Sequence, residues 1–143
     1  MNNSRKLKIV KNYEPCLAFE NEEIFRNGIF HFNISRIIDH ISSGKLNVER
    51  EKIDIGDWYR THNFHGSINE GHLPLVDVTK PVIQAEIRPE RYEIIDGNHR
   101  LEKAYRNNIC VVDSYKLKGE QLVEYFIDIR GYLAFVDYWN SKL

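Results

Sequence analysis

The stretch that decides the fold reads Ile94-Ile95-Asp96-Gly97-Asn98-His99-Arg100-Leu101. Its two isoleucines close an apolar run of the kind that forms a buried strand, and the Asp-Gly pair that follows is typical of a tight turn. Beyond the turn, Leu101, Ala104 and Tyr105 recur at helical spacing. The stretch therefore predicts a strand that passes directly into a helix.

A strand-to-helix turn of this kind is a candidate phosphate site. The first N–H groups of a helix have no partners within the helix, and they lie at the positive end of its dipole. Gly97 lets a phosphate approach the backbone and permits an unusual backbone angle, while Asn98, His99 and Arg100 add neutral and cationic donors. We expect His99 and Arg100 to point toward solvent and ligand. Three roles stay open for Asp96: it caps the helix, orients His99 or holds a metal ion that bridges phosphates.

The alternative is an ordinary surface turn, in which Asn98 caps the helix and Arg100 is paired on the surface. However, four polar side chains stand between an apolar strand and an apolar helix, where each of them forgoes core packing. This arrangement favours a functional site.

The sequence around the turn predicts a small sheet. Residues 81–87 and 91–95 read as the two strands of a β-hairpin that turns at residues 88–90. Asn107-Asn108 can end the helix in the left-handed conformation that asparagine tolerates, and residues 110–117 read as a further strand. Together with the helices predicted elsewhere, these elements indicate an α+β fold.

Three other segments have a readable periodicity. Residues 34–41 place four isoleucines on one helical face, with Asn33 as the N-cap and Gly44 beyond the end of the helix. Residues 7–10 alternate like a short strand, and residues 16–19 read as another.

The remaining segments are read mainly from composition. Residues 56–74 predict a short helix followed by a loop. Residues 119–143 predict one or two amphipathic helices whose aromatic side chains lie in the core or at an interface. The mixed charges at residues 22–23 and 49–52 are typical of solvated faces.

Composition limits the classes of protein. A chain of 143 residues with 42% hydrophobic residues can build one core, so we expect one domain. A formal net charge of -1 provides no global positive field to hold bulk DNA or an anionic membrane. Cys16 and Cys110 form no CxxC pattern, and we expect two small buried thiols in a reducing compartment. Because no N-terminal apolar run is long enough for a signal peptide or a membrane span, we expect a cytoplasmic protein with no membrane partner.

The residues around the turn carry a family resemblance. The segment reads Tyr92-Glu93-Ile94-Ile95-Asp96-Gly97-Asn98-His99-Arg100-Leu101-Glu102-Lys103-Ala104. It resembles the DG(N/H)HR box of the ParB/sulfiredoxin superfamily, and in particular its ParB-like nuclease domain type, with the best match over residues 81–117. The resemblance implies a single compact ParB/sulfiredoxin-like domain over residues 1–143, with a small mixed sheet and flanking helices. It also implies a nucleotide at the box: CTP as in ParB partition proteins, ATP as in sulfiredoxins, or ADP or ATP as in free-serine kinases.

The chain differs from sulfiredoxins and from ParB partition proteins at residues that these branches need for their functions, which limits the activities that the resemblance implies. Sulfiredoxin-like boxes carry their catalytic cysteine immediately before His-Arg, where this chain has Asn98, so sulfinic-acid reduction is disfavoured. ParB partition proteins carry an arginine-rich box and a following helix-turn-helix domain, whereas this chain ends soon after its box. Centromere binding of that kind is therefore not expected, and the box is nearest to the serine-kinase and ParB-like nuclease types.

The leading functional prediction is nucleotide binding at Gly97, Asn98, His99 and Arg100, with Mg²⁺-dependent phosphoryl transfer or nucleotide hydrolysis. Asp96, His99 and Arg100 are the candidate catalytic residues, and Asp96 is the candidate metal ligand. One alternative is a nuclease with the same groups, which requires a basic groove. Another is a nucleotide- or DNA-binding module without turnover, which signals to a protein partner or a second copy through the C-terminal aromatic helices.

Three histidines lie within residues 56–74, shortly before the hairpin. His62, His65 and His72 could supply imidazole ligands to zinc or another divalent ion, since three protein ligands suffice for a catalytic site. Their spacing is not a recognised metal signature, which favours solvent-exposed or supporting histidines. In either case, this loop is expected to fold over the phosphate site as a cover that gives substrate specificity.

Overall fold

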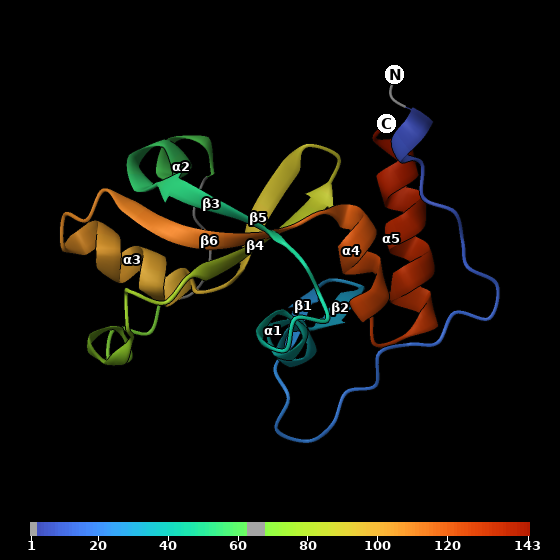
Figure 1. Ribbon diagram of the computed structural model, residues 1–143, viewed down its shortest axis with the longest axis horizontal. Coiled ribbons are helices and arrows are strands. Elements are labelled where there is room, and N and C mark those ends of the chain that lie inside the picture. The colour runs from blue at the N-terminus through green and yellow to red at the C-terminus, as the bar shows by residue number, and fades with distance from the viewer. Residues whose placement is uncertain (1–2, 63–67) are drawn as a thin grey trace. The chain divides into compact units, whose positions relative to one another are not determined.

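The computed structural model describes residues 3–62 and 68–143 and has the predicted α+β class. It contains a two-stranded and a four-stranded sheet with helices between the strands (Figure 1). The chain forms two compact units. The first comprises Met1–Val48, Glu86–Tyr92 and Lys118–Leu143, and the second comprises Glu49–Ala85 and Glu93–Leu117. The expected single domain over residues 1–143 stays a prediction.

The four-stranded sheet has the order β3-β6-β4-β5. Its strands are β3 (Glu49–Asp54), β4 (Val82–Arg88), β5 (Arg91–Asp96) and β6 (Val111–Leu117). Only Pro89 and Glu90 separate β4 from β5, and Glu90 has a positive φ of 69°, so the predicted hairpin is confirmed. The chain then crosses through a helix before β6, which places β6 parallel to β4, while β3 pairs antiparallel to β6. The sheet is therefore mixed, as predicted.

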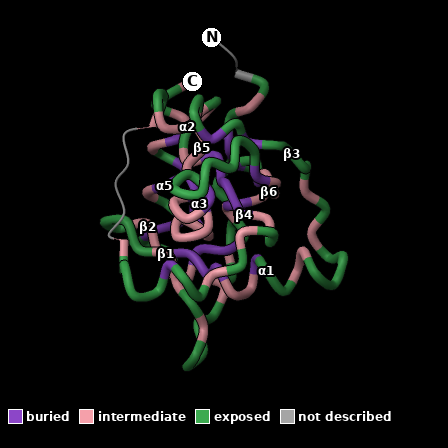
Figure 2. Tube along the Cα trace, turned by 90° about the vertical axis from the view of Figure 1, so that its left-hand side faces the viewer, coloured by how far each residue is buried: buried purple, intermediate pink, exposed green. Residues whose placement is uncertain are grey.

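Three helical segments accompany this sheet. They are α2 (Ile55–Thr61), the 3₁₀ turn η2 (Leu73–Leu75) and α3 (Asn98–Arg106). Asn108, at φ 60°, lies just beyond α3 in the predicted left-handed conformation. The core of this unit consists of Ile53, Ile55, Val82, Ile94, Leu101, Ala104 and Val112. Strand β4 is buried over five successive residues (Figure 2), as expected for a central strand.

The first unit contains the hairpin β1 (Ile24–Asn27) and β2 (Phe30–Asn33), which leads directly into α1 (Ile34–Ser42). The predicted cap of α1 is confirmed, because the Asn33 side chain accepts a hydrogen bond from the backbone N–H of Arg36 at 2.9 Å. Gly44, at φ 79°, follows the helix end as predicted.

The C-terminal third forms α4 (Gly119–Leu122), the 3₁₀ turn η3 (Val123–Tyr125) and α5 (Ile129–Ser141). The aromatic rings of this region are mostly core: Phe126, Phe135 and Trp139 are fully buried. Phe30 of β2 packs edge-on against Phe126 and Phe135. The expectation of a helical, aromatic C-terminal region is confirmed, and most of its rings serve the interior of this unit.

Two predicted strands are wrong. Residues 7–10 and 16–19 are irregular, because their backbone groups bond to side chains and to a loop instead of a neighbouring strand. The N–H of Val10 donates to the hydroxyl of Tyr132 at 2.8 Å, and the N–H of Cys16 donates to the carbonyl of Phe126 at 2.8 Å.

The charged run at residues 49–52 is exposed, as predicted, and it belongs to β3, an edge strand on which charged side chains discourage pairing with another chain. The prediction for the cysteines needs correction. Both cysteines are free, but Cys110 is exposed and Cys16 is half-buried, so neither is the buried thiol that was expected.

Candidate functional site

The junction of β5 and α3 is the turn predicted from the sequence. Strand β5 ends at Asp96, and Gly97 follows as the N-cap of α3 in the left-handed conformation, with φ 104° and ψ 19°. Glycine adopts this conformation without the cost that a Cβ atom imposes. The Gly97 carbonyl accepts the first helical hydrogen bond from Leu101 at 2.9 Å, but no side chain caps the helix. The strand-to-helix turn is confirmed, and its phosphate stays a prediction.

Gly97 also has a packing role. A Cβ atom at this position would lie 2.7 Å from Cγ1 and 2.9 Å from Cβ of Val82, a fully buried residue of β4. These distances are shorter than real Cβ contacts allow. The glycine is therefore required for the close approach of the turn to β4, whatever ligand the turn binds.

Arg100 is held inside the site. Its guanidinium donates to the Asp96 carboxylate at 2.8 Å and to the Pro81 carbonyl at 2.5 Å. The side chains of Arg100 and Asp96 are only 18% and 19% exposed. The expectation that Arg100 points toward solvent is therefore wrong, since the pair links the helix to the start of β4. Two of the five guanidinium N–H donors are used in this way, which leaves three for a ligand.

Asp96 does not cap α3, because the N-cap is Gly97 and Asp96 bonds to Arg100 instead. Within residues 3–62 and 68–143, no hydrogen bond joins Asp96 to His99. The same residues contain no cluster of three or more His, Cys, Asp or Glu side chains that could hold a metal ion. Mg²⁺ commonly binds proteins through one or two carboxylates plus substrate phosphates and water. A role for Asp96 as such a ligand stays a prediction.

His99 faces the loop that precedes η2. The backbone N–H of Asn69 donates to Nε2 of His99 at 3.0 Å. The ring of His72 stands edge-on to the His99 ring, with centroids 4.9 Å apart. Because Nε2 accepts a hydrogen bond, the neutral imidazole carries its proton on Nδ1. His99 therefore points toward a loop, and its remaining donor is Nδ1–H.

The same loop, residues 69–76, is held along one face of α3. His99, Lys103 and Arg106 are spaced four and three residues apart, so they share a helical face. Lys103 donates to two loop carbonyls at 3.1 and 2.9 Å. Arg106 makes a two-point ion pair with Glu70 at 2.5 and 2.8 Å, and these bonds hold the pKa of Glu70 below its ordinary value. Residues 69–76 are thus fastened to α3, and the role of this loop as a cover over a phosphate site stays a prediction.

Asn98 is the first residue of α3 and is half-exposed. Among the described residues, its side chain has no hydrogen-bond partner. It therefore retains both amide donors and its carbonyl oxygen beside the uncapped N–H groups of the helix.

Of the three histidines predicted as possible metal ligands, His62 and His72 lie within the described residues, and each contacts a different partner. The ring of His62 stacks on Trp58, with centroids 3.7 Å apart and planes 3° from parallel. His72 packs against His99, and His65 lies outside the described residues. The structure supports packing roles for His62 and His72.

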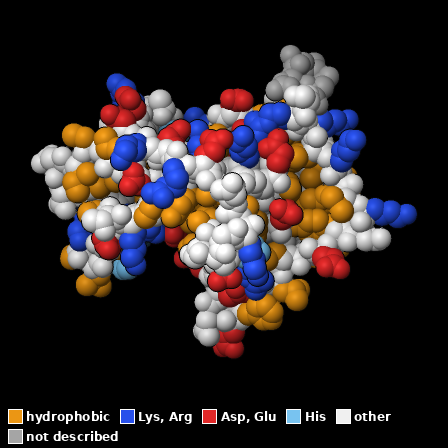
Figure 3. Space-filling model, in the orientation of Figure 1, with side chains coloured by type: hydrophobic (Ala, Val, Ile, Leu, Met, Phe, Trp, Pro, Cys, Tyr) orange, Lys and Arg blue, Asp and Glu red, His pale blue; other side chains and the backbone are white. Residues whose placement is uncertain are grey.

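Cations in this unit are mostly neutralised by neighbours. Beside Arg100 and Arg106, ion pairs join Lys52 to Asp113 and Lys116 to Glu51. Figure 3 shows basic and acidic side chains interspersed over the visible face. A basic groove of the kind that a nuclease needs is not formed by these paired cations.

Sequence reasoning missed the residues that hold the loop, namely Asn69, Glu70, Lys103 and Arg106. The spacing of His99, Lys103 and Arg106 indicates a polar stripe on α3, but it does not reveal which segment the stripe contacts. That partner is set by the path of the loop in space.

Comparisons of the chain with protein-family models, curated proteins and solved structures found no match. Among the described helices, none combines the length and apolar character needed to cross a bilayer.

Proposed function

We propose that the β5–α3 junction binds the phosphates of a nucleotide. The observation that carries this proposal is the uncapped start of α3, where helix N–H groups lie beside the free amide of Asn98. Helix N-termini with this geometry attract anions through their unpaired donors and the helix dipole. The resemblance of residues 92–104 to the DG(N/H)HR box supports the same ligand.

Within this proposal each polar residue has a distinct part. Asn98 and Nδ1–H of His99 donate to phosphate oxygens, while Asp96 holds Arg100 in a fixed position from which its remaining donors act. The loop at residues 69–76 covers α3 and contacts the base or the sugar. Because His99 bonds to Asn69 within that loop, nucleotide binding and loop position are coupled.

The chemistry proposed for this site is phosphoryl transfer or nucleotide hydrolysis. Helix N–H groups and Arg100 stabilise negative charge on the phosphoryl oxygens, and His99 supplies a proton or a hydrogen bond. Mg²⁺ bound at Asp96 would neutralise charge between adjacent phosphates. The two free thiols fit a reducing compartment, and we propose that the protein acts in the cytoplasm.

A small nucleotide is favoured over nucleic acid by the charges. Extended nucleic-acid contacts need several unneutralised cations, because phosphate contacts dominate their affinity. In the second unit, Lys52, Arg100, Arg106 and Lys116 are each paired with a carboxylate. Binding of DNA or RNA is therefore the alternative outcome of the test and not the leading proposal.

The test is calorimetric titration with ATP, ADP, CTP and nucleoside monophosphates, with and without Mg²⁺. Asn98→Ala should weaken binding of the preferred nucleotide about 10- to 150-fold, since a hydrogen bond to a charged group contributes about 1.5–3 kcal/mol. Asn107→Ala, at the opposite end of α3, is the matched control and should leave affinity unchanged. The proposal fails if no nucleotide binds the folded wild-type chain, or if both variants bind equally. Tighter binding of a DNA duplex than of any nucleotide would support the alternative.

A further inference from the structure

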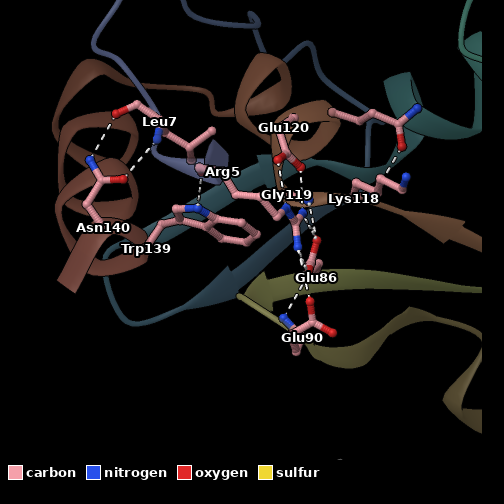
Figure 4. A network of polar contacts seen from close by, with 10 residues as sticks. Arg5, Leu7, Glu86, Glu90, Lys118, Gly119, Glu120, Trp139 and Asn140 are labelled. Atoms are coloured by element: carbon pink, nitrogen blue, oxygen red, sulfur yellow. Dashed lines mark hydrogen bonds and ion pairs between the residues drawn. The ribbon is translucent and has the colours of Figure 1, made fainter. Parts of the chain in front are cut away.

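Residues 3–16, here called the N-terminal arm, are held in the first unit by hydrogen bonds to α5 (Figure 4). The side-chain amide of Asn140 makes two hydrogen bonds with the backbone of Leu7. Leu7 N–H donates to Asn140 Oδ1, and Leu7 C=O accepts from Asn140 Nδ2, each at 2.9 Å. The indole N–H of Trp139 donates to the carbonyl of Arg5 at 2.9 Å. The arm begins with the 3₁₀ turn η1 (Asn3–Arg5), and these bonds bind its backbone at Arg5 and Leu7 without depending on the arm's side chains.

Arg5 is bound by two acidic side chains. Its guanidinium makes a two-point contact with Glu86 at 2.8 and 2.6 Å and a second one with Glu120 at 3.0 and 2.7 Å (Figure 4). Its central carbon lies 4.9 Å from the centre of the Trp139 ring. The Glu86 side chain is only 1% exposed and also accepts the backbone N–H groups of Glu90 and Gly119 at 2.7 and 3.1 Å. A buried carboxylate arranged in this way selects a guanidinium over a neutral group.

The side chain of Leu7 is buried, whereas the neighbouring Lys6 and Lys8 are exposed. Alternate side chains of the arm therefore enter the surface made by α4, α5 and residues 86–90. We call this surface the arm groove. Its specificity is for an arginine that ends a 3₁₀ turn, followed two residues later by an aliphatic side chain.

Beyond Leu7 the arm packs incompletely. It spans a hollow of about 280 Å³ whose walls include Val10 and Tyr13 from the arm and Val123, Tyr132 and Val136 from the body. The Tyr13 ring stacks on Tyr132 at 3.7 Å, but side chains that face a hollow lose part of their dispersion contacts. The arm is thus fastened by separate directional anchors and not by continuous packing.

The stretch that joins the arm to β1 is suited to act as a hinge. Residues 17–21 are all exposed, including Leu17 and Phe19 at 64% and 59%. Asn21 has a positive φ of 75°. A change in their backbone angles breaks the hydrogen bonds of Leu17 with Asn33, at 3.2 Å, and of Phe19 with Glu22, at 2.8 Å, but moves no buried residue of the core.

We propose that the arm groove is a peptide-binding site that accepts the N-terminal arm of a second copy of this chain. Every contact made within one chain is available between two copies, and reciprocal exchange closes a two-fold dimer without new contacts. The charges are complementary, since the arm carries Arg5 and three lysines within residues 5–11 and the groove presents Glu86 and Glu120. The site shares no residue with the β5–α3 junction and does not depend on the function proposed there.

Exchange competes with the tethered arm. A short flexible tether gives an effective concentration of about 1 mM, so a dimer of the native chain should form only near that concentration. Two complementary variants avoid this competition. Arg5→Glu removes the arginine that anchors the arm but leaves the arm groove native. Glu120→Arg leaves the arm native but places a positive charge in the arm groove, where it repels Arg5.

The test mixes these two full-length variants and measures mass by sedimentation and native mass spectrometry. One native arm can then occupy one native groove in trans, so a 1:1 heterodimer is expected that neither variant forms alone. Lys6→Glu mixed with Glu120→Arg is the matched control, because it reverses an exposed charge beside Arg5 and should give no heterodimer. Near-ultraviolet circular dichroism checks folding, and Arg5→Ala replaces Arg5→Glu if the latter unfolds. A mixture that stays monomeric while both variants are folded overturns the proposal.

A labelled peptide of residues 2–12 identifies the occupant. It should bind the Arg5→Ala chain in a fluorescence anisotropy titration, and reversing the peptide's arginine to glutamate should weaken binding at least tenfold. Equal binding of both peptides would overturn the specificity. Peptide binding without any heterodimer would show that the groove serves a different protein, which would overturn the proposal of a second copy.

Discussion

Replacing Gly97 with alanine tests how the β5–α3 junction is built. Two costs act on the variant. The first is backbone strain, because an L-residue at φ 104° costs about 1–2 kcal/mol. The second is overpacking against Val82, where the new Cβ would lie 2.7 Å from Cγ1, and this costs about 1–3 kcal/mol. We expect a total loss of about 2–5 kcal/mol in the free energy of unfolding.

The two costs can be separated within the same chain. Gly44 also has a positive φ, of 79°, but a Cβ atom there would meet nothing within 4 Å. Gly44→Ala should therefore show the backbone term alone, at about 1–2 kcal/mol. Combining Gly97→Ala with Val82→Ala removes the nearest colliding atom, so the double variant should be more stable than the sum of the two single losses by about 1 kcal/mol.

Urea unfolding followed by circular dichroism measures these differences, with the m-value as a check on cooperativity. The reasoning is refuted if Gly97→Ala is no less stable than Gly44→Ala, or if the losses at positions 97 and 82 are additive. Since Gly97 is required for packing, its substitution cannot isolate a ligand contact. Asn98 is the better position for that purpose.

Three further predictions concern ionisation and thiol chemistry. Burial alone would raise the pKa of Glu86, but hydrogen bonds from Arg5 and two backbone N–H groups outweigh it and hold the pKa below the ordinary value of 4.5. Glu86 therefore adds stability above about pH 4.5 that is lost as the pH falls through its folded pKa, and Glu86→Gln should flatten the acid limb of a pH–stability curve. Burial raises the pKa of Tyr125 to about 12, so Tyr125→Phe should remove an ultraviolet titration step near that pH; an unchanged titration curve would contradict this. Cys110 is exposed and lies outside the junction, so Cys110→Ser should change neither stability by more than about 0.5 kcal/mol nor nucleotide binding, and a loss of binding in the folded variant would point to thiol chemistry.

Local patterns predicted the elements whose signals lie within a few residues. Asn33 caps α1 as expected because its side chain reaches the N–H three residues ahead. The turn at Gly97 and the left-handed Asn108 follow from backbone sterics that each residue carries with it. The alternation at residues 7–10 is misleading because the backbone groups of Leu7 and Val10 bond to the side chains of Asn140 and Tyr132, more than 120 residues away, and not to a strand partner.

The sequence by itself therefore determined the α+β class, the hairpin and the strand-to-helix turn, since periodicity and turn chemistry are properties of neighbouring residues. Only the tertiary structure decided how the polar residues of that turn are used. Arg100 donates to Asp96 and Pro81, and His99 accepts from the Asn69 N–H, so polar groups that look free in the sequence are already bonded. The physical reason is that a buried or half-buried donor must find an acceptor, and the acceptor nearest in space is set by the path of the whole chain.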